Sequence, residues 1–161
     1  MPATVVWRKN KVFHNDVDLF GNVEKGSLEI KRKFVETGGI GTPALAKVPT
    51  GKFEPLSATF TFNNISPTIM RHLLSNGGFC NFRMVGECHM TDASVGLVKS
   101  DRLTSIIRGY AENLPIPEIG SEDKMDAEVI IHALFIEIKD NSGTLLMVDI
   151  PNGLVEPKAL G

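Results

Sequence analysis

Residues 56–62 alternate strictly between apolar and small hydroxyl side chains, and this pattern limits the possible folds of the chain more than any other. A period of two residues is typical of a pleated strand with one buried face and one solvated face. The apolar positions are Leu56, Ala58, Phe60 and Phe62, and the hydroxyl positions between them are Ser57, Thr59 and Thr61. We therefore predict a strand whose apolar side belongs to the hydrophobic core.

A short helix is predicted directly after this strand. Ser66 is a good N-cap, and Pro67 suits the first helical position, where its missing N–H costs no hydrogen bond. The predicted helix runs from Pro67 to Asn76, and its apolar stripe consists of Ile69, Met70, Leu73 and Leu74. A helix of about two and a half turns is not stable alone. We expect it to pack across one face of a sheet, with Arg71 and His72 elsewhere around the helix.

The remaining patterns predict further strands. We expect a strand pair in residues 5–20, strands over 23–32, 79–90 and 102–112, and a closing hairpin over 125–150. Gly26 and Gly86 are candidate β-bulges. Residues 91–101 are expected to form a polar loop. The predicted fold class is mainly β, a small antiparallel β-barrel or sandwich with one short flanking helix and long loops.

Composition restricts the function. The 161 residues are 42% hydrophobic, and we expect them to form a single domain, residues 1–161. The formal net charge of −2 argues against tight binding to nucleic acid phosphates. Charged and polar residues near Trp7 interrupt the start of the chain, so no signal peptide is expected, and no apolar run approaches a membrane span.

Three segments are expected to lie outside the regular strands. Residues 35–52 are rich in glycine and proline yet too apolar for a solvated linker, so we expect a loop that packs either on its own domain or on another molecule. Residues 113–124 form a second, acidic loop, and residues 151–161 form a turn-rich C-terminal tail.

No motif points to catalysis, and we expect neither a metal nor another cofactor. The histidines lack metal-binding spacing, and no GxSxG or phosphate-binding glycine motif is present. Cys80, Cys88 and His89 form a loose cluster, but Cys88 and His89 would point to opposite faces of a strand. We interpret both cysteines as small core residues. His132 lies in an apolar strand and is expected to be structural.

The order of several short segments is informative. The segments are Asn10–Asp16, Leu28–Lys33, Gly38–Gly41, Leu56–Phe62 with the following helix, Arg108–Tyr110, and the hairpin 125–150 that ends at Val148–Ile150. In this order the chain resembles the major tail tube proteins of contractile-tailed bacteriophages. It is more distantly similar to the tubes of phage-derived bacteriocins and type VI secretion systems. Asp16 stands where a glycine is commoner in that family, and the arginine that precedes its glycine-rich loop is missing here.

The resemblance implies a structural protein of the virion, assembled in the host cytoplasm. Copies join by their sheet edges into hexameric rings, and the rings stack into a hollow tube through which DNA is ejected. The implied partners are further copies of the chain, the tail sheath, the tape measure protein, and the baseplate and tail terminator proteins. DNA passes without specific binding, and no membrane anchoring is expected.

The same resemblance suggests roles for individual residues. The segment 35–52 becomes an arm that contacts a neighbouring subunit, with its contact residues at Gly38, Gly39, Ile40, Gly41, Leu45 and Val48. Ser57, Thr59, Thr61 and Glu128 are candidates for the wall of the channel. Arg71 and His72 are candidates for an outer surface that meets the sheath.

Three alternatives stay open. The chain could instead form the tube of a bacteriocin or of a secretion machine, which the sequence does not distinguish from a phage tail. A small monomeric ligand-binding β-barrel would surround a closed cavity with the polar strand faces. A hydrolase or metal enzyme would be built around His132 or the Cys88–His89 pair.

Overall fold

The computed structural model describes residues 4–15, 17–19, 23–63, 66–92, 94–113 and 126–160. The described part of the chain is mainly β with one short α-helix, which confirms the predicted fold class. The strands are β1 (Thr4–His14), β2 (Val17–Asp18), β3 (Val23–Glu29), β4 (Arg32–Thr37), β5 (Ala46–Phe53), β6 (Ser57–Asn63), β7 (Phe79–Asp92), β8 (Gly96–Ala111), β9 (Asp126–Asp140), β10 (Gly143–Asp149) and β11 (Leu154–Glu156). The helical elements are α1 (Pro67–Leu74) and two short 3₁₀ turns, Ser75–Gly78 and Lys158–Leu160.

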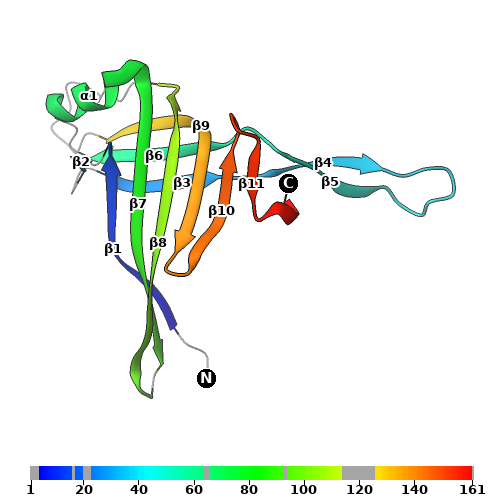
Figure 1. Ribbon diagram of the computed structural model, residues 1–161, viewed down its shortest axis with the longest axis horizontal. Helices are drawn as coiled ribbons and strands as arrows, with labels where there is room; N and C mark the ends of the chain where they lie inside the picture. The colour runs from blue at the N-terminus through cyan, green and yellow to red at the C-terminus, as the bar shows by residue number, and fades with distance from the viewer. Residues whose placement is uncertain are drawn as a thin grey trace.

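The body of the protein is a folded antiparallel sheet. Its main path runs in the order β11-β10-β9-β8-β7-β1-β2, and β3 and β6 join it through β9. Strand β9 takes part in both layers, because residues 126–132 pair with β6 while residues 135–140 pair with β10. In Figure 1, β3 and β6 run across the direction of β7 and β8. Two layers that cross and share a strand are typical of orthogonal β-sandwiches.

The layer change depends on a glycine. The pairing of β8 with β9 shifts register between Arg108 and Gly109, next to the point where β9 passes from one layer to the other. A Cβ at Gly109 would clash with the backbone carbonyl oxygen of His132. Only glycine allows the two backbones to approach this closely, so this position holds the corner of the sandwich.

The core fills the space between the two layers. Phe60 and Phe62 from β6 and Phe82 from β7 are fully buried, and the rings of Phe60 and Phe82 stack at 4.3 Å. Along β6 the burial alternates without exception between buried and half-buried residues, as the sequence predicts. Aromatic rings therefore occupy the interior where a ligand-binding barrel would hold its ligand.

Helix α1 begins as predicted and ends two residues earlier than predicted. The Ser66 side chain accepts a hydrogen bond from the backbone N–H of Ile69, and Pro67 opens the helix. The helix stops at Leu74 because Asn76 and Gly77 have positive φ angles of 59° and 66°. Leu73 is buried, and Ile69 and Met70 pack on the core, whereas Leu74 is 41% exposed. The helix thus covers one end of the sandwich, beside β1 and β7 (Figure 1).

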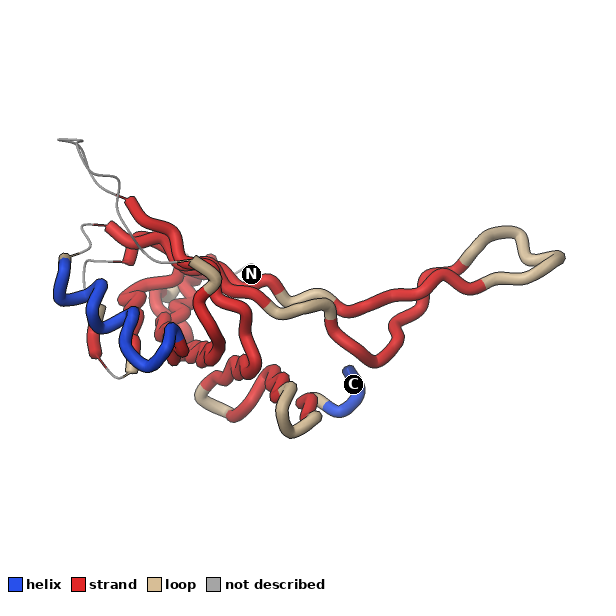
Figure 2. The backbone as a smooth tube through the Cα atoms, turned by 90° about the horizontal axis from the view of Figure 1, so that it is seen from above, coloured by secondary structure: helices blue, strands red, loops and turns tan. Residues whose placement is uncertain are grey.

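Residues 35–52 are not the strandless loop that their glycines and prolines suggest. Strands β4 and β5 form a separate two-stranded sheet, with Val35 opposite Val48 and Thr37 opposite Ala46. We call residues 32–53 the arm. It extends far from the body of the protein in both Figure 1 and Figure 2. Proline is tolerated here because Pro49 lies in a two-stranded ribbon, where a missing N–H need not break a ladder on both sides.

The remaining predictions concern two hairpins, three loop or tail segments and a β-bulge. The hairpins 5–20 and 125–150 are confirmed by the pairing of β1 with β2 and of β9 with β10. Residues 91–101 are not a loop, because β7 and β8 stay paired up to Asp92 and Gly96. The register is regular between Gly86 and β8, but the pairing of β7 with β1 shifts between Arg8 and Lys11, opposite Gly86, so the predicted irregularity at Gly86 is found on the β1 side. The acidic loop lies outside the described residues except for Asn113, and the tail contains β11 and a 3₁₀ turn.

Candidate assembly surfaces

The arm exposes large apolar side chains over its whole length. Phe34 and Val35 on β4 and Val48 on β5 are 49%, 44% and 41% exposed, and Ile40 and Leu45 near the tip are 111% and 64% exposed. Isolated two-stranded hairpins are marginally stable in water. Several large exposed apolar side chains gathered on one hairpin indicate an interaction site. The arm therefore has the properties of a segment that another molecule covers.

The tip of the arm is an ordered turn. The hydroxyl of Thr42 donates a hydrogen bond of 2.6 Å to the Gly39 carbonyl, and the N–H of Thr42 donates to the same oxygen at 3.1 Å. A Cβ at Gly38 would lie 2.7 Å from a methyl carbon of Leu45, and Gly41 has φ of +91°. The glycines thus allow the chain to turn and hold Ile40 at the extreme end of the hairpin.

The structure brings all predicted arm residues together. Gly38, Gly39, Ile40, Gly41 and Leu45 lie in the connection between β4 and β5, and Val48 follows on β5. Sequence reasoning missed Phe34 and Val35, which add apolar area on β4. Residues 32–37 contain Phe34, Val35 and Thr37, which are residue types that favour strands, and this signal could have predicted β4.

The second surface is the solvated face of β6 and its neighbours. Ser57, Thr59 and Thr61 are half-buried, so they are not part of the core. In register, Thr61 lies opposite Glu128 of β9, which places all predicted channel residues on one face. The same pairing adds further members that the sequence did not suggest: Lys25, Ser27 and Glu29 from β3 and Ile130 and His132 from β9. We call this surface the β6 face.

The β6 face carries more carboxylates than cations among its described residues. Ser57 donates a hydrogen bond to Glu29 at 3.4 Å, and a hydrogen bond from Lys31 at 2.8 Å lowers the pKa of Glu29 and keeps it ionised. His132 lies 3.3 Å from Glu112, and both side chains are 55% exposed. The face is thus lined by hydroxyl groups and is weakly acidic.

The predicted outer residues have different environments. Arg71 is exposed on α1. His72 is half-buried, and its Nε2 lies 3.0 Å from the carbonyl oxygen of His14. Because a carbonyl only accepts hydrogen bonds, the His72 ring donates this one. His72 therefore fastens α1 to β1 within the same protomer, which leaves Arg71 as the residue of the pair that is available to a partner.

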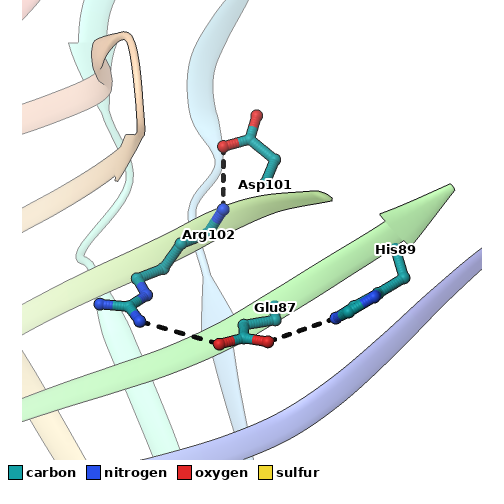
Figure 3. Close-up of polar contacts among 4 residues, drawn as sticks. All are labelled: Glu87, His89, Asp101 and Arg102. Atoms are coloured by element: carbon teal, nitrogen blue, oxygen red, sulfur yellow. Dashed lines mark hydrogen bonds and ion pairs between the residues drawn. The ribbon is translucent and has the colours of Figure 1, made fainter. Parts of the chain in front are cut away.

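A polar cluster lies on the outer side of the β7–β8 hairpin. Figure 3 shows Glu87 between His89 and Arg102, at 3.2 and 3.7 Å, while the backbone N–H of Arg102 donates to Asp101 at 2.8 Å. Asp101 also accepts a hydrogen bond from the backbone N–H of Asn141. The cluster therefore ties the β7–β8 hairpin to the β9–β10 turn. It contains no nucleophilic hydroxyl or thiol.

The cysteines do not supply a nucleophile beside this cluster. Cys88 is buried, on the opposite face of β7 from His89, and both cysteines are free thiols. Burial raises the pKa of Cys80 to about 11, so it is an unreactive thiol at neutral pH. Within the described ranges, no three His, Cys, Asp or Glu side chains are grouped so that they could hold a metal ion.

Several strands of the described body have open edges, among them β11, which pairs only with β10. Strand β3 pairs only with β6 in the described sheet, and β2 covers only Phe13 and His14 of β1. Exposed N–H and C=O groups along such edges favour pairing with another chain. The open edges and the arm together give the protein surfaces for self-association.

The chain is similar to a known family of proteins. A model of the family described as phage tail tube protein FII matches residues 7–156, which is nearly the whole chain. A comparison with curated proteins found no match. No helix in the part of the chain that the structure describes is long and apolar enough to span a membrane.

Proposed function

The chain belongs to the family of phage tail tube protein FII, a structural tube subunit of a phage tail, and on that premise we propose that it builds the inner tube of a contractile tail. In this proposal, six copies form a ring and the rings stack into a hollow tube. The tube carries the genome during ejection.

The arm is the observation that carries the proposal. Its exposed apolar side chains include Phe34, Ile40 and Leu45, which are 49%, 111% and 64% exposed. Burial of apolar surface is the main driving force of protein association. A tube subunit that is soluble before assembly and stable afterwards needs such a surface, held at a distance from its own core.

The β6 face is the proposed wall of the channel. Its hydroxyl groups, with Ser57, Thr59 and Thr61 in one row, offer no strong attraction to phosphate. Glu128 and Glu29 add negative charge. DNA passing a wall of this kind would not be held by ion pairs with phosphates, since such binding requires basic residues. This choice of face rests on the chemistry of the side chains.

The remaining roles follow from a contractile tail. The sheath would surround the tube, and Arg71 on α1 is the proposed contact. The tape measure protein would occupy the channel during assembly, and the baseplate and tail terminator proteins would cap the two ends. Assembly would take place in the host cytoplasm. No step in this work is catalytic, and we propose that the chain is not an enzyme.

Negative-stain electron microscopy and sedimentation of the purified chain test the proposal. Rings with sixfold symmetry or long tubes with a central channel support it. A chain that stays monomeric at high concentration, also when tail initiation proteins are added, overturns it. Addition of the sheath protein from the same phage separates a contractile tail from other tubes, because only the former predicts a sheath that assembles around the tube.

A further inference from the structure

A groove opens at one end of β3, between β3 and the β1–β2 pair. It has a volume of about 480 Å³. Its floor is apolar and includes Val12, Met84 and Leu103, all of which are half-buried. Its rim is polar and includes Asp18 and Lys25. An apolar centre surrounded by a polar rim is the usual anatomy of a protein–protein contact.

Next to the groove, β1 and β3 are irregular, although the rest of each strand keeps its open edge. The pairing of β1 shifts register between Arg8 and Lys11, and the pairing of β3 shifts between Val23 and Lys25. Both irregularities lie next to the groove, whose lining includes Lys11 and Val23. Bulges bend an edge strand and interrupt its hydrogen bonding. The groove is therefore suited to receive side chains rather than an added strand.

The groove and the arm lie at opposite ends of β3. The groove is lined by residues 23–26, at the start of the strand, while the arm begins at Arg32, just after its end. The arm then extends away from the body (Figures 1 and 2). Its tip therefore points away from its own groove. A donor at one end of a protomer and an acceptor at the other is the arrangement that joins copies head to tail.

We propose that this groove receives the tip of the arm of a second copy of the chain, with Ile40 and Leu45 as the inserted side chains. This inference rests on the proposed tube function and adds the acceptor site. Ile40 and Leu45 are the most exposed apolar residues of the arm, at 111% and 64%. The groove exceeds the roughly 150 Å³ that holds a benzene ring in an engineered cavity, so both side chains fit. Met84 on the floor can adjust its flexible side chain to them.

Cross-linking in assembled particles tests the pairing. A chain with Ile40→Cys and Asp18→Cys carries one thiol at the tip and one at the rim of the groove. Cys80 and Cys88 are 1% and 8% exposed and give little background. A short bismaleimide is expected to produce a ladder beyond the dimer. The matched control combines Asp18→Cys with Val95→Cys, because Val95 is an equally isolated apolar residue, 74% exposed, on the β7–β8 turn. The control is expected to give no ladder.

Each result decides the proposal. Tubes that form without a ladder above the single-cysteine variants overturn the groove as the acceptor, while the tube function survives. If the double variant does not assemble, the two cysteines are placed on separately tagged chains diluted in unmodified protein, and cross-linked dimers of the two tags replace the ladder as the readout. As a second measurement, Ile40→Ala with Leu45→Ala is expected to raise the critical concentration for assembly by about tenfold or more. An unchanged critical concentration contradicts the insertion of these side chains.

Discussion

Acidification is expected to destabilise the protomer through His14. This residue is fully buried on β1, its two ring nitrogens have no hydrogen-bond partner, and its ring packs at 4.7 Å from His72 and 4.8 Å from Phe82. Burial, with a smaller contribution from His72, lowers the pKa of His14 from 6.5 to about 4. A proton on this ring is unfavourable in the folded protein because no carboxylate or carbonyl receives it.

The sign and size of the effect follow from the two pKa values. The unfolded chain takes up the proton below pH 6.5, whereas the folded chain resists it down to about pH 4. The contribution of the neutral His14 ring to the free energy of unfolding is therefore complete above pH 6.5, and it is lost as the pH falls from 6.5 to about 4. One pKa unit corresponds to about 1.4 kcal/mol, so the full loss is about 3 kcal/mol and the loss between pH 7 and pH 5 is roughly 2 kcal/mol.

The variant His14→Leu isolates this contribution. Leucine is similar in volume and leaves no unpaired polar atom, so we expect the free energy of unfolding at pH 7 to change by less than about 1.5 kcal/mol. The His72 hydrogen bond survives because it uses the backbone carbonyl of residue 14. Urea unfolding at pH 7, 6 and 5, at a concentration below assembly, measures both proteins. Between pH 7 and pH 5, the free energy of unfolding of the variant should fall by roughly 2 kcal/mol less than that of the unmodified chain.

A control at an exposed histidine completes the experiment. His132 is 55% exposed, and His132→Gln is expected to keep the loss of stability that His14 causes between pH 7 and pH 5, because it leaves the buried His14 ring in place. If His14→Leu shows the same pH dependence as the unmodified chain, the reasoning about a buried, unpartnered imidazole is refuted.

Three further predictions concern packing, capping and the arm. Gly26→Ala should reduce the free energy of unfolding by about 1–3 kcal/mol in urea titrations, since its Cβ would lie 2.9 Å from Phe60 and Met84 atoms; a neutral change would contradict the close packing of β3 on the core. Ser66→Ala should cost about 1 kcal/mol by the same assay, because the helix loses its cap; no change would show that the cap contributes nothing. Ile40→Ser should alter stability by less than about 0.5 kcal/mol and yet reduce tube yield in electron micrographs, and full assembly would remove the arm from the interface.

The sequence predicts those strands and helices whose signal lies in residues that are neighbours along the chain. The alternation over 56–62 and the Ser66–Pro67 start of α1 depend on neighbours in sequence, and both are confirmed. The arm was missed as a strand pair because glycine and proline in residues 35–52 obscure its pairing, which depends on residues across the hairpin such as Val35 and Val48. The helix end was missed because Asn76 takes a left-handed conformation that the sequence only weakly indicates.

The arm and the β6 face could also be predicted only in part from the sequence. The exposure of Ile40 and Leu45 agrees with the expectation that the segment 35–52 meets another surface. The partners of Thr59 and Thr61 on the β6 face were not predictable, because strand order, and with it the register of β3 and β9, is set by tertiary pairing. The tie between His72 and His14 spans 58 positions of the chain, and no local pattern indicates it.

A three-dimensional electron microscopy map of assembled tubes tests the central claim most directly. We predict that the arm lies between protomers, with Ile40 buried against another copy, and that the face with Ser57, Thr59 and Thr61 borders an open channel. A map in which the arm projects into solvent, or in which the β6 face lies away from the channel, would contradict the proposed assembly.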